Sequence, residues 1–227
     1  MWVQLVEGQN YEKMVQQARQ LFLAADQDQI IKNWDLQADE EHIYLEFFSQ
    51  RLKIDRKSAG ISAAEPGLPM AFPLTRTTNE SMVLFDLLTR RPAQAVGSWA
   101  SISMLGGIIG QGHDRTLRNE PQAAVFAGNC EKLAAACEAL GGRRESKADV
   151  GFAIPVFKDF KILFQFWDAD DEFPASIKYL FDANALQLMH YETLWYLMHC
   201  CYERIAWQFG RMQPGSTVRS QVAQKAT

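Results

Sequence analysis

The sequence has few cysteines, no excess of basic residues and no long apolar run free of polar interruptions. The four cysteines, Cys130, Cys137, Cys200 and Cys201, form no CxxC pair, and adjacent cysteines such as the last two rarely bond each other. We therefore expect reduced thiols and a cytoplasmic location. Lysine and arginine number 23 against 27 aspartates and glutamates, and the resulting net charge of −4 disfavours a nucleic-acid-binding protein.

Targeting and membrane signals are also missing from the sequence. The segment that begins Met1-Trp2-Val3-Gln4 has no basic start and no long apolar stretch, so it does not resemble a secretory signal. The longest uncharged run, Pro92 to His113, is interrupted by glutamines, serines and glycines, which a membrane-spanning helix would leave in hydrocarbon. We expect no association with a membrane.

The first part of the chain shows both helical and strand periodicity. Its 227 residues are 48% hydrophobic, enough for a full core. Three-four spacing predicts a helix from Tyr11 to Ala25 and a short helix from Asp28 to Asn33. Alternation from His42 to Ile54 predicts a β-hairpin, and the prolines and glycines of Ser58 to Thr75 predict a long surface loop.

The remaining segments extend the same mixture. Helices are predicted over Asn79–Arg90, over Glu120–Leu140 in two pieces split near Gly128 and stopped by Gly141-Gly142, over a short segment opened by Pro174, and over Tyr191–Gln208. Strands over Val150–Pro155 and Phe160–Trp167 form a second predicted hairpin, and Trp99–Leu105 stays ambiguous. We predict an α+β fold, in which hairpin strands form an antiparallel or mixed sheet against several helices and helix outweighs strand. It forms a single domain over residues 1–210, followed by a flexible polar tail over 211–227.

Four carboxylates are concentrated in one short segment. Asp168, Asp170, Asp171 and Glu172 lie within five residues at the end of a predicted strand. Because like charges this close repel, a hard metal or a basic ligand would explain them. A helix start is the alternative, because acids and proline favour helix N-termini. A calcium loop of the helix–loop–helix type fails, since it requires glycine at the sixth position and glutamate at the twelfth.

The glycine stretch that includes Gly106 and Gly107 matches neither a dinucleotide fingerprint nor a phosphate loop. It could present backbone amides to an anion if it opens a helix, or it could form a turn. Cys130 and Cys137 share a helical face, which favours small apolar filling. His199-Cys200-Cys201 is not expected to bind metal, because adjacent helical side chains point about 100° apart.

The last predicted helix carries Trp195, Tyr196 and Trp207 besides its apolar stripe. Some of these rings must lie off the buried face. They indicate either a dimer surface or ligand groove, or packing beneath the Ser58–Thr75 loop.

The segment Trp167–Ala175, followed by Leu180-Phe181-Asp182 and by Glu192, resembles the C-terminal signature of an uncharacterised family, domain of unknown function thirty-seven eighty-six. The similarity extends upstream, so that it covers roughly Tyr11 to Arg204. This chain has Ala169 where relatives often carry glycine.

The resemblance implies an origin among anaerobic bacteria or archaea and no established activity. Some relatives resemble fusions to cysteine-rich iron–sulfur segments, which implies anaerobic redox or cofactor metabolism; the four cysteines here lack cluster spacing. By similarity, the ligand-binding candidates are Asp168, Asp170, Asp171, Glu172, Asp182 and Glu192, to which the residues themselves add Gly106 and Gly107.

Three functional hypotheses follow. The first is a small-molecule or cofactor-binding module, with its site between the acidic turn, the glycine stretch and the last helix. The second is a non-catalytic interaction subunit that docks through its aromatic last helix, for example as a homodimer. The third is a metal-assisted or acid–base enzyme that uses the carboxylates of residues 168–172. The residues identify no cofactor, no catalytic residue and no metal ligand.

Overall fold

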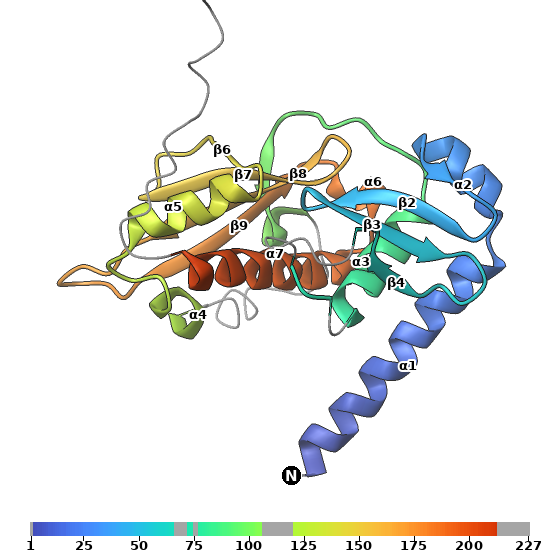
Figure 1. Ribbon diagram of the computed structural model, residues 1–227. Helices are drawn as coiled ribbons and strands as arrows, with labels where there is room; N and C mark the ends of the chain where they lie inside the picture. The colour runs from blue at the N-terminus through green and yellow to red at the C-terminus, as the bar shows by residue number, and fades with distance from the viewer. Residues whose placement is uncertain (1, 66–71, 75–76, 106–119, 213–227) are drawn as a thin grey trace, which may run out of the picture.

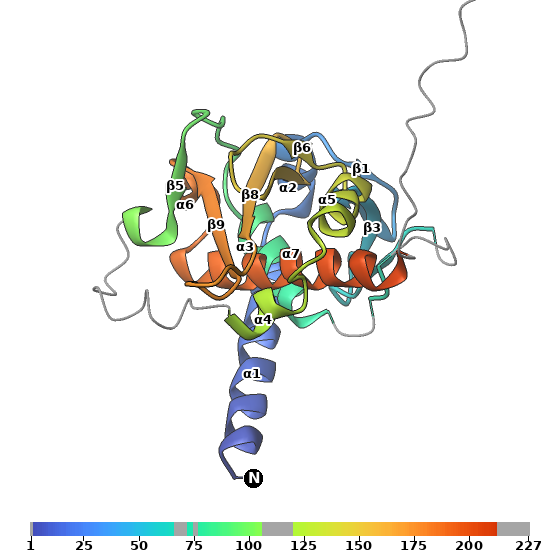
Figure 2. The same cartoon turned by 90° about the vertical axis from the view of Figure 1, so that its left-hand side faces the viewer.

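The computed structural model describes residues 2–65, 72–74, 77–105 and 120–212, with the backbone alone for residues 2–11 and 120 (Figure 1). The chain opens with α1 (Trp2–Ala24) and α2 (Gln27–Trp34). Asp26 separates the two helices, because its carboxylate accepts a hydrogen bond from the Gln29 amide at 2.9 Å and caps α2. The N-terminal half of α1 projects from the body, whereas Phe22 near its end packs on Phe85 (Figures 1 and 2).

The predicted first hairpin is confirmed and forms the centre of a small antiparallel sheet. The strands are β1 (Gln37–Ala38), β2 (His42–Phe47), β3 (Gln50–Asp55) and β4 (Ile61–Ala63), in that spatial order. Ile43, Leu45 and Phe47 alternate with more exposed residues and bury one face of β2. The short strand β4 lies inside the segment predicted to be a loop.

A second antiparallel sheet contains the predicted second hairpin. Its strands are β5 (Trp99–Ser101), β6 (Arg143–Arg144), β7 (Val150–Phe157), β8 (Phe160–Trp167) and β9 (Ser176–Asp182), in the order β5-β9-β8-β7-β6. The hairpin of β7 and β8 is confirmed. The residues of β7 are almost all buried, so this strand is covered on both faces.

The expectation that Pro174 opens a helix is wrong. The residues after it form β9, whose Ile177, Tyr179 and Phe181 pair with β8 and alternate with more exposed side chains. The acidic segment is therefore the connection of a β-hairpin and not a helix N-terminus. The acid-then-proline pattern favours a helix start, but the two-residue alternation that follows it is that of a strand.

The remaining helices connect and cover the sheets. They are α3 (Thr78–Leu88), the 3-10 helix η1 (Ile102–Leu105), α4 (Glu120–Ala124), α5 (Cys130–Ala139), α6 (Ala185–Leu188) and α7 (Tyr191–Arg211). The predicted split between α4 and α5 and the predicted last helix are both confirmed. Helix exceeds strand, and the α+β prediction is confirmed. Within the described part of the chain, no helix is long and apolar enough to cross a membrane.

The helix α7 is the central support of the fold. It packs against α3 and α5, and Figure 2 shows it running across the width of the body. The ring of Phe126 contacts Phe164 and Phe166 of β8 and Tyr202 and Phe209 of α7, with centroids 5.1 to 6.5 Å apart. This aromatic cluster fixes α7 against the larger sheet.

Candidate functional site

Asp168 is engaged by local hydrogen-bond donors. Each of its carboxylate oxygens accepts from the Gly128 amide at 3.0 Å, and Oδ1 also accepts from its neighbour Ala169 at 2.8 Å. The Gly128 amide is the largest influence on the pKa of Asp168 and lowers it. Through its bonds to Gly128, this carboxylate links the start of the β8–β9 connection to the loop between α4 and α5.

The other carboxylates of the acidic connection lie at its exposed tip. Asp170 Oδ1 accepts hydrogen bonds from the amides of Glu172 and Phe173 at 2.9 and 2.7 Å, which is a local turn of the aspartate type. Asp171 and Glu172 are exposed. Across the described residues, no three His, Cys, Asp or Glu side chains are grouped so that they could hold a metal ion.

Asp182 and Glu192 lie away from the acidic connection. Asp182 ends β9, where its carboxylate accepts hydrogen bonds from the amides of Val96 and Gly97 at 3.1 and 2.9 Å. The six steps along β9 from Ser176 to Asp182 span roughly 20 Å at about 3.3 Å per residue. Glu192 is exposed in the first turn of α7.

The structure therefore has the acidic connection before β9 and Asp182 at the end of that strand, whereas Glu192 lies on α7. It does not bring Asp168, Asp170, Asp171 and Glu172 together with Asp182 and Glu192. Gly106 and Gly107 lie outside the described residues. Ligand binding by these residues stays a prediction.

All four cysteines are free. Cys130 is half-buried, and its thiol donates to Asp168 Oδ2 at 3.5 Å. Burial first, and then this carboxylate, raise the pKa of Cys130 to about 11, so the thiol is protonated near neutral pH. Cys137, Cys200 and Cys201 are fully buried, and burial raises the pKa of each thiol, as expected of apolar filling.

The aromatic side chains of α7 contact their own chain. Trp195 and Tyr196 are half-buried against the core, and the Tyr196 hydroxyl donates to the sulfur of Met14 at 3.9 Å. Trp207 packs edge-on against Phe72 with centroids 6.0 Å apart, which confirms for this ring the packing beneath the Ser58–Thr75 segment. A homodimer formed through this helix stays a prediction.

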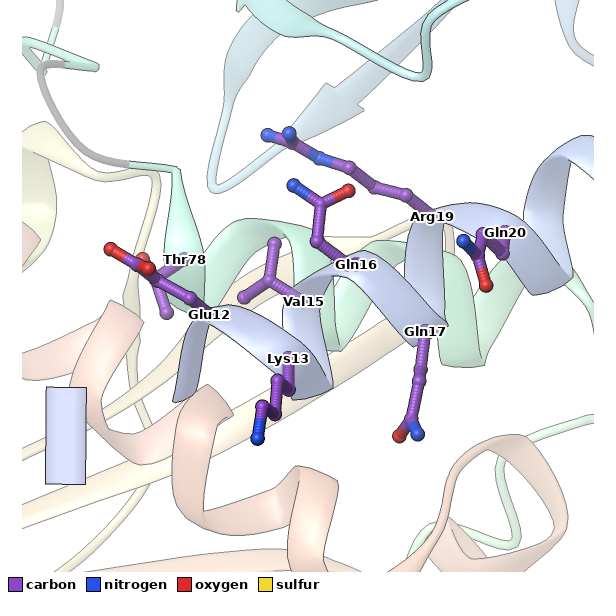
Figure 3. Close-up of a pocket in the computed structure, with 8 residues that line it drawn as sticks. All are labelled: Glu12, Lys13, Val15, Gln16, Gln17, Arg19, Gln20 and Thr78. Atoms are coloured by element: carbon purple, nitrogen blue, oxygen red, sulfur yellow. The ribbon is translucent and has the colours of Figure 1, made fainter. Parts of the chain in front are cut away.

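One of the hollows on the surface lies along α1. It has a volume of about 650 Å³, and of the described residues that line it Thr78 alone lies outside that helix. Figure 3 shows that Gln16 and Arg19 point to one side of α1, whereas Lys13 and Gln17 point to the other. Because these polar groups diverge, the hollow lacks a convergent binding centre.

A second hollow, which we call the junction groove, lies where the end of α2, the β2–β3 hairpin and the β7–β8 turn meet. It has a volume of about 400 Å³ and is lined by Asp35, Leu36, Gln37, Tyr44, Leu45, Glu46, Arg51, Phe157 and Lys158. Its walls thus come from three segments that are distant in the sequence.

Two walls of the junction groove contain residues with left-handed backbone. Asp35 has φ of 47° at the end of α2, and Lys158 has φ of 49° in the β7–β8 turn. The Lys158 ammonium donates to the Asp35 carbonyl at 2.8 Å and so joins the two walls. Behind them, Trp34 packs against Phe157 at 5.1 Å and donates its indole N–H to the Leu88 carbonyl. A left-handed backbone conformation is costly for residues other than glycine, and it persists only where surrounding contacts hold it. These contacts hold Asp35 and Lys158 in this conformation.

The third wall carries a guanidinium over an aromatic ring. Arg51 lies 5.5 Å from the centroid of Tyr44 on the neighbouring strand, and it donates to the Gln37 side-chain oxygen at 2.6 Å. The Tyr44 hydroxyl donates to Asp39 at 2.8 Å, and this bond raises the pKa of the tyrosine and lowers that of the aspartate. The phenol is therefore neutral near pH 7.

The two cations of the junction groove bind neutral oxygens. Arg51 is held by an amide and Lys158 by a main-chain carbonyl, and in the described parts of the chain neither has a carboxylate within ion-pairing distance. Asp35 and Glu46 line the same groove. The arrangement can bind an anionic group and, beside it, a hydrogen-bond donor.

Sequence reasoning missed the junction groove. Each wall is an ordinary strand end or turn by its local pattern, and no motif marks the segments as neighbours. The one local signal was the turn Phe157-Lys158-Asp159-Phe160 between two predicted strands, which fixes where Lys158 lies but not what it faces.

Residues 26–204 match the profile of the family described as Domain of unknown function (DUF3786). Because this match covers well over half of the chain, the protein belongs to that family. No curated protein and no solved structure is significantly similar to it. The match begins just after α1 and contains every wall of the junction groove.

Proposed function

We propose that this member of the family binds a small molecule with an anionic group, a carboxylate or a phosphate, in the junction groove. The observation that carries the proposal is the pair of cations, Arg51 and Lys158, that line one hollow and that form no ion pair with a carboxylate of the described residues. An anionic group placed between them gains two charge-assisted hydrogen bonds, which are stronger than bonds between neutral groups.

The remaining lining supports a ligand that also donates hydrogen bonds. The carboxylates of Asp35 and Glu46 can accept from an amine or hydroxyl, and the Tyr44 ring offers an apolar surface. A volume of about 400 Å³ lies within the range of small-molecule sites. This assignment keeps the small-molecule-binding hypothesis but places the site away from the acidic connection.

Chemical-shift titration of the full-length, ¹⁵N-labelled protein tests the proposal. Sodium phosphate and sodium glutamate serve as separate probes against sodium chloride of equal ionic strength. We expect at least one probe to cause saturable shifts at the amides of residues 35–37, 44–46 and 157–158, and the comparison of the two identifies the preferred anion.

Matched variants decide whether the groove is responsible. Lys158→Ala and Arg51→Ala should each weaken binding about tenfold or more, in line with the loss of one charge-assisted bond. Lys161→Ala and Arg143→Ala remove exposed cations that do not line the groove and should leave binding unchanged. The proposal is overturned if neither probe gives saturable shifts, or if the groove variants bind as the controls do.

We further propose that the protein acts in the cytoplasm. The support is the burial of three free thiols in the core, which suits a reducing compartment. Fractionation of cells that express the native gene tests this location. Recovery of the protein outside the cytoplasmic fraction would contradict it.

A further inference from the structure

The start of α7 contains a carboxylate–imidazole contact that the junction groove does not involve. Asp86 on α3 and His190, the residue that precedes α7, lie 104 positions apart in sequence. His190 Nδ1 and Asp86 Oδ1 are 2.6 Å apart. The Asp86 side chain is 12% exposed, whereas the imidazole is 67% exposed.

The two carboxylate oxygens of Asp86 have different hydrogen-bond partners. Oδ2 accepts the main-chain N–H of His190 and the hydroxyl of Thr193, each at 2.6 Å, and thereby caps α7 from a neighbouring helix. Oδ1 accepts from the His190 ring and from Arg90 Nε at 3.1 Å. Oδ2 makes both of its contacts without the imidazole, so the ring contact on Oδ1 requires a separate explanation.

Stability alone explains the ring contact poorly. A pair with one largely exposed member gains little in water, and it restricts a side chain that would otherwise rotate freely. The other aspartate–histidine contact shows the difference. His42 Nδ1 lies 3.8 Å from Asp39, whose side chain is 52% exposed. Only the pair at α7 combines a short contact, a half-buried carboxylate and an exposed ring among the described histidines.

We propose that Asp86 and His190 form a proton-transfer dyad, in which Asp86 orients the imidazole and Nε2 accepts a proton from a small hydroxyl-bearing molecule at the start of α7. The Nδ1–H bond to the carboxylate selects the tautomer whose Nε2 lone pair faces solvent. The proton passes from the hydroxyl to Nε2, which leaves an oxyanion on the molecule and an imidazolium beside the charged Asp86.

The surrounding charges are compatible with this role. Arg90 contacts the same carboxylate oxygen as the ring, which keeps Asp86 ionised. Glu192 is exposed in the first turn of α7 and belongs to the predicted ligand-binding residues. The dyad uses none of the residues of the junction groove, so failure of either proposal leaves the other standing.

Imidazole ¹⁵N spectra of the full-length protein at a pH where histidines are neutral test the first part of the proposal. We expect His190 to be the Nδ1–H tautomer, with Nε2 unprotonated. His199, exposed and without a carboxylate contact among the described residues, should prefer the Nε2–H form of free imidazole. A His190 tautomer like that of His199 overturns the proposal, and this comparison needs no variant of Asp86.

Two variants separate orientation of the ring from capping of the helix. Asp86→Asn removes the charge that Nδ1–H faces, and His190 should lose its tautomer preference. Thr193→Val removes a donor to Oδ2 alone, and the tautomer should stay as in the unchanged chain. Equal effects of the two variants would mean that the contact is part of the cap and would overturn the dyad.

The reactivity of Nε2 supplies the second readout. Diethyl pyrocarbonate acylates neutral imidazole nitrogen, and mass spectrometry gives the rate at each histidine. His190 should react several-fold faster than His199, and Asp86→Asn should remove that difference. A rate at His190 equal to that at His199, or one unaffected by Asp86→Asn, overturns the proposal.

Discussion

At the scale of single residues, the most unusual feature is a buried ion pair between α3 and α7. Glu80 and Arg204 are each 1% exposed, and Arg204 Nη2 lies 2.9 Å from Glu80 Oε1. The contact is an ion pair whose N–H geometry is not that of a hydrogen bond. The guanidinium also lies 4.5 to 5.1 Å from the ring centroids of Phe47, Phe48 and Phe72. Such a site stabilises a charge only as long as its partner is present.

The first prediction concerns this pair. Glu80→Gln leaves the Arg204 charge buried without its counter-charge, so we expect a loss of about 3–5 kcal/mol in the free energy of unfolding. Urea denaturation followed by circular dichroism measures it. Glu80→Gln combined with Arg204→Met removes both charges and should be less destabilised than Glu80→Gln alone. A double variant that is less stable than either single variant would contradict the argument.

The second prediction concerns pH and Asp86. Burial is the largest single influence and raises the pKa of Asp86, but hydrogen bonds from Thr193, His190 and Arg90 together outweigh it and lower the pKa. Because the folded-state pKa lies below the unfolded value of about 3.9, the carboxylate stabilises the protein above that pH. This contribution is lost as the pH falls through the folded-state pKa.

Urea midpoints measured from neutral pH down to acid check this sign. We expect the urea midpoint of Asp86→Asn to lie below that of the unchanged chain at neutral pH. The difference between the two midpoints should become smaller as the pH falls. Asp171→Asn changes an exposed position, so its urea midpoint should vary with pH in the same way as that of the unchanged chain. A difference at Asp86→Asn that widens in acid would contradict the prediction.

At the scale of secondary-structure elements, the pattern of apolar residues was sufficient to predict the longer elements, whether one face or both faces of the element are buried. The β2–β3 hairpin and α7 were predicted because their apolar residues repeat with the period of the element, and the β7–β8 hairpin because each of its strands is a short, mostly apolar run. The short strands β1, β5 and β6 were not predicted, since two or three residues carry no period. Their positions depend on the strands that they join.

The candidate sites were less predictable than the fold, for a physical reason. The acidic residues were visible in the sequence, but Asp170 bonds to the amides of Glu172 and Phe173, a local turn that the residue types alone favour. The contact between Asp86 and His190 depends on how α3 meets α7, which no local pattern encodes. The same holds for the walls of the junction groove.

The third prediction concerns the end of α5. Gly141 has φ of 77°, and a Cβ atom there would lie 2.9 Å from the Ser49 hydroxyl oxygen. We therefore expect Gly141→Ala to cost about 1 kcal/mol or more of stability, since the left-handed backbone alone disfavours alanine. At Gly210 in α7 a Cβ atom would have no described atom within 4 Å, so Gly210→Ala should be neutral or stabilising. Thermal unfolding compares the two, and a Gly141→Ala protein as stable as Gly210→Ala would contradict the assignment.

At the scale of the whole molecule, the turn between β2 and β3 joins the two sheets. The Phe48 amide donates to the Val156 carbonyl of β7 at 2.9 Å, and the Ser49 hydroxyl donates to the Leu140 carbonyl at 3.1 Å. Phe48 and Ser49 have φ of 50° and 58°, a conformation for which hairpin turns favour asparagine and glycine. The contacts across the junction, including the ring of Phe48 on Arg204, hold this costly turn in place.

The last prediction follows from that junction. If the turn, Arg204 and α7 unite both sheets, the prediction of a single domain over residues 1–210 requires one cooperative unfolding transition. Tryptophan fluorescence and far-ultraviolet circular dichroism should then give the same urea midpoint, and calorimetric and van't Hoff enthalpies should agree. Phe48→Ala removes the ring that contacts Arg204, so it should lower the shared midpoint by weakening the junction. Two separated transitions in the unchanged chain would show that the sheets unfold independently and that the turn does not couple them.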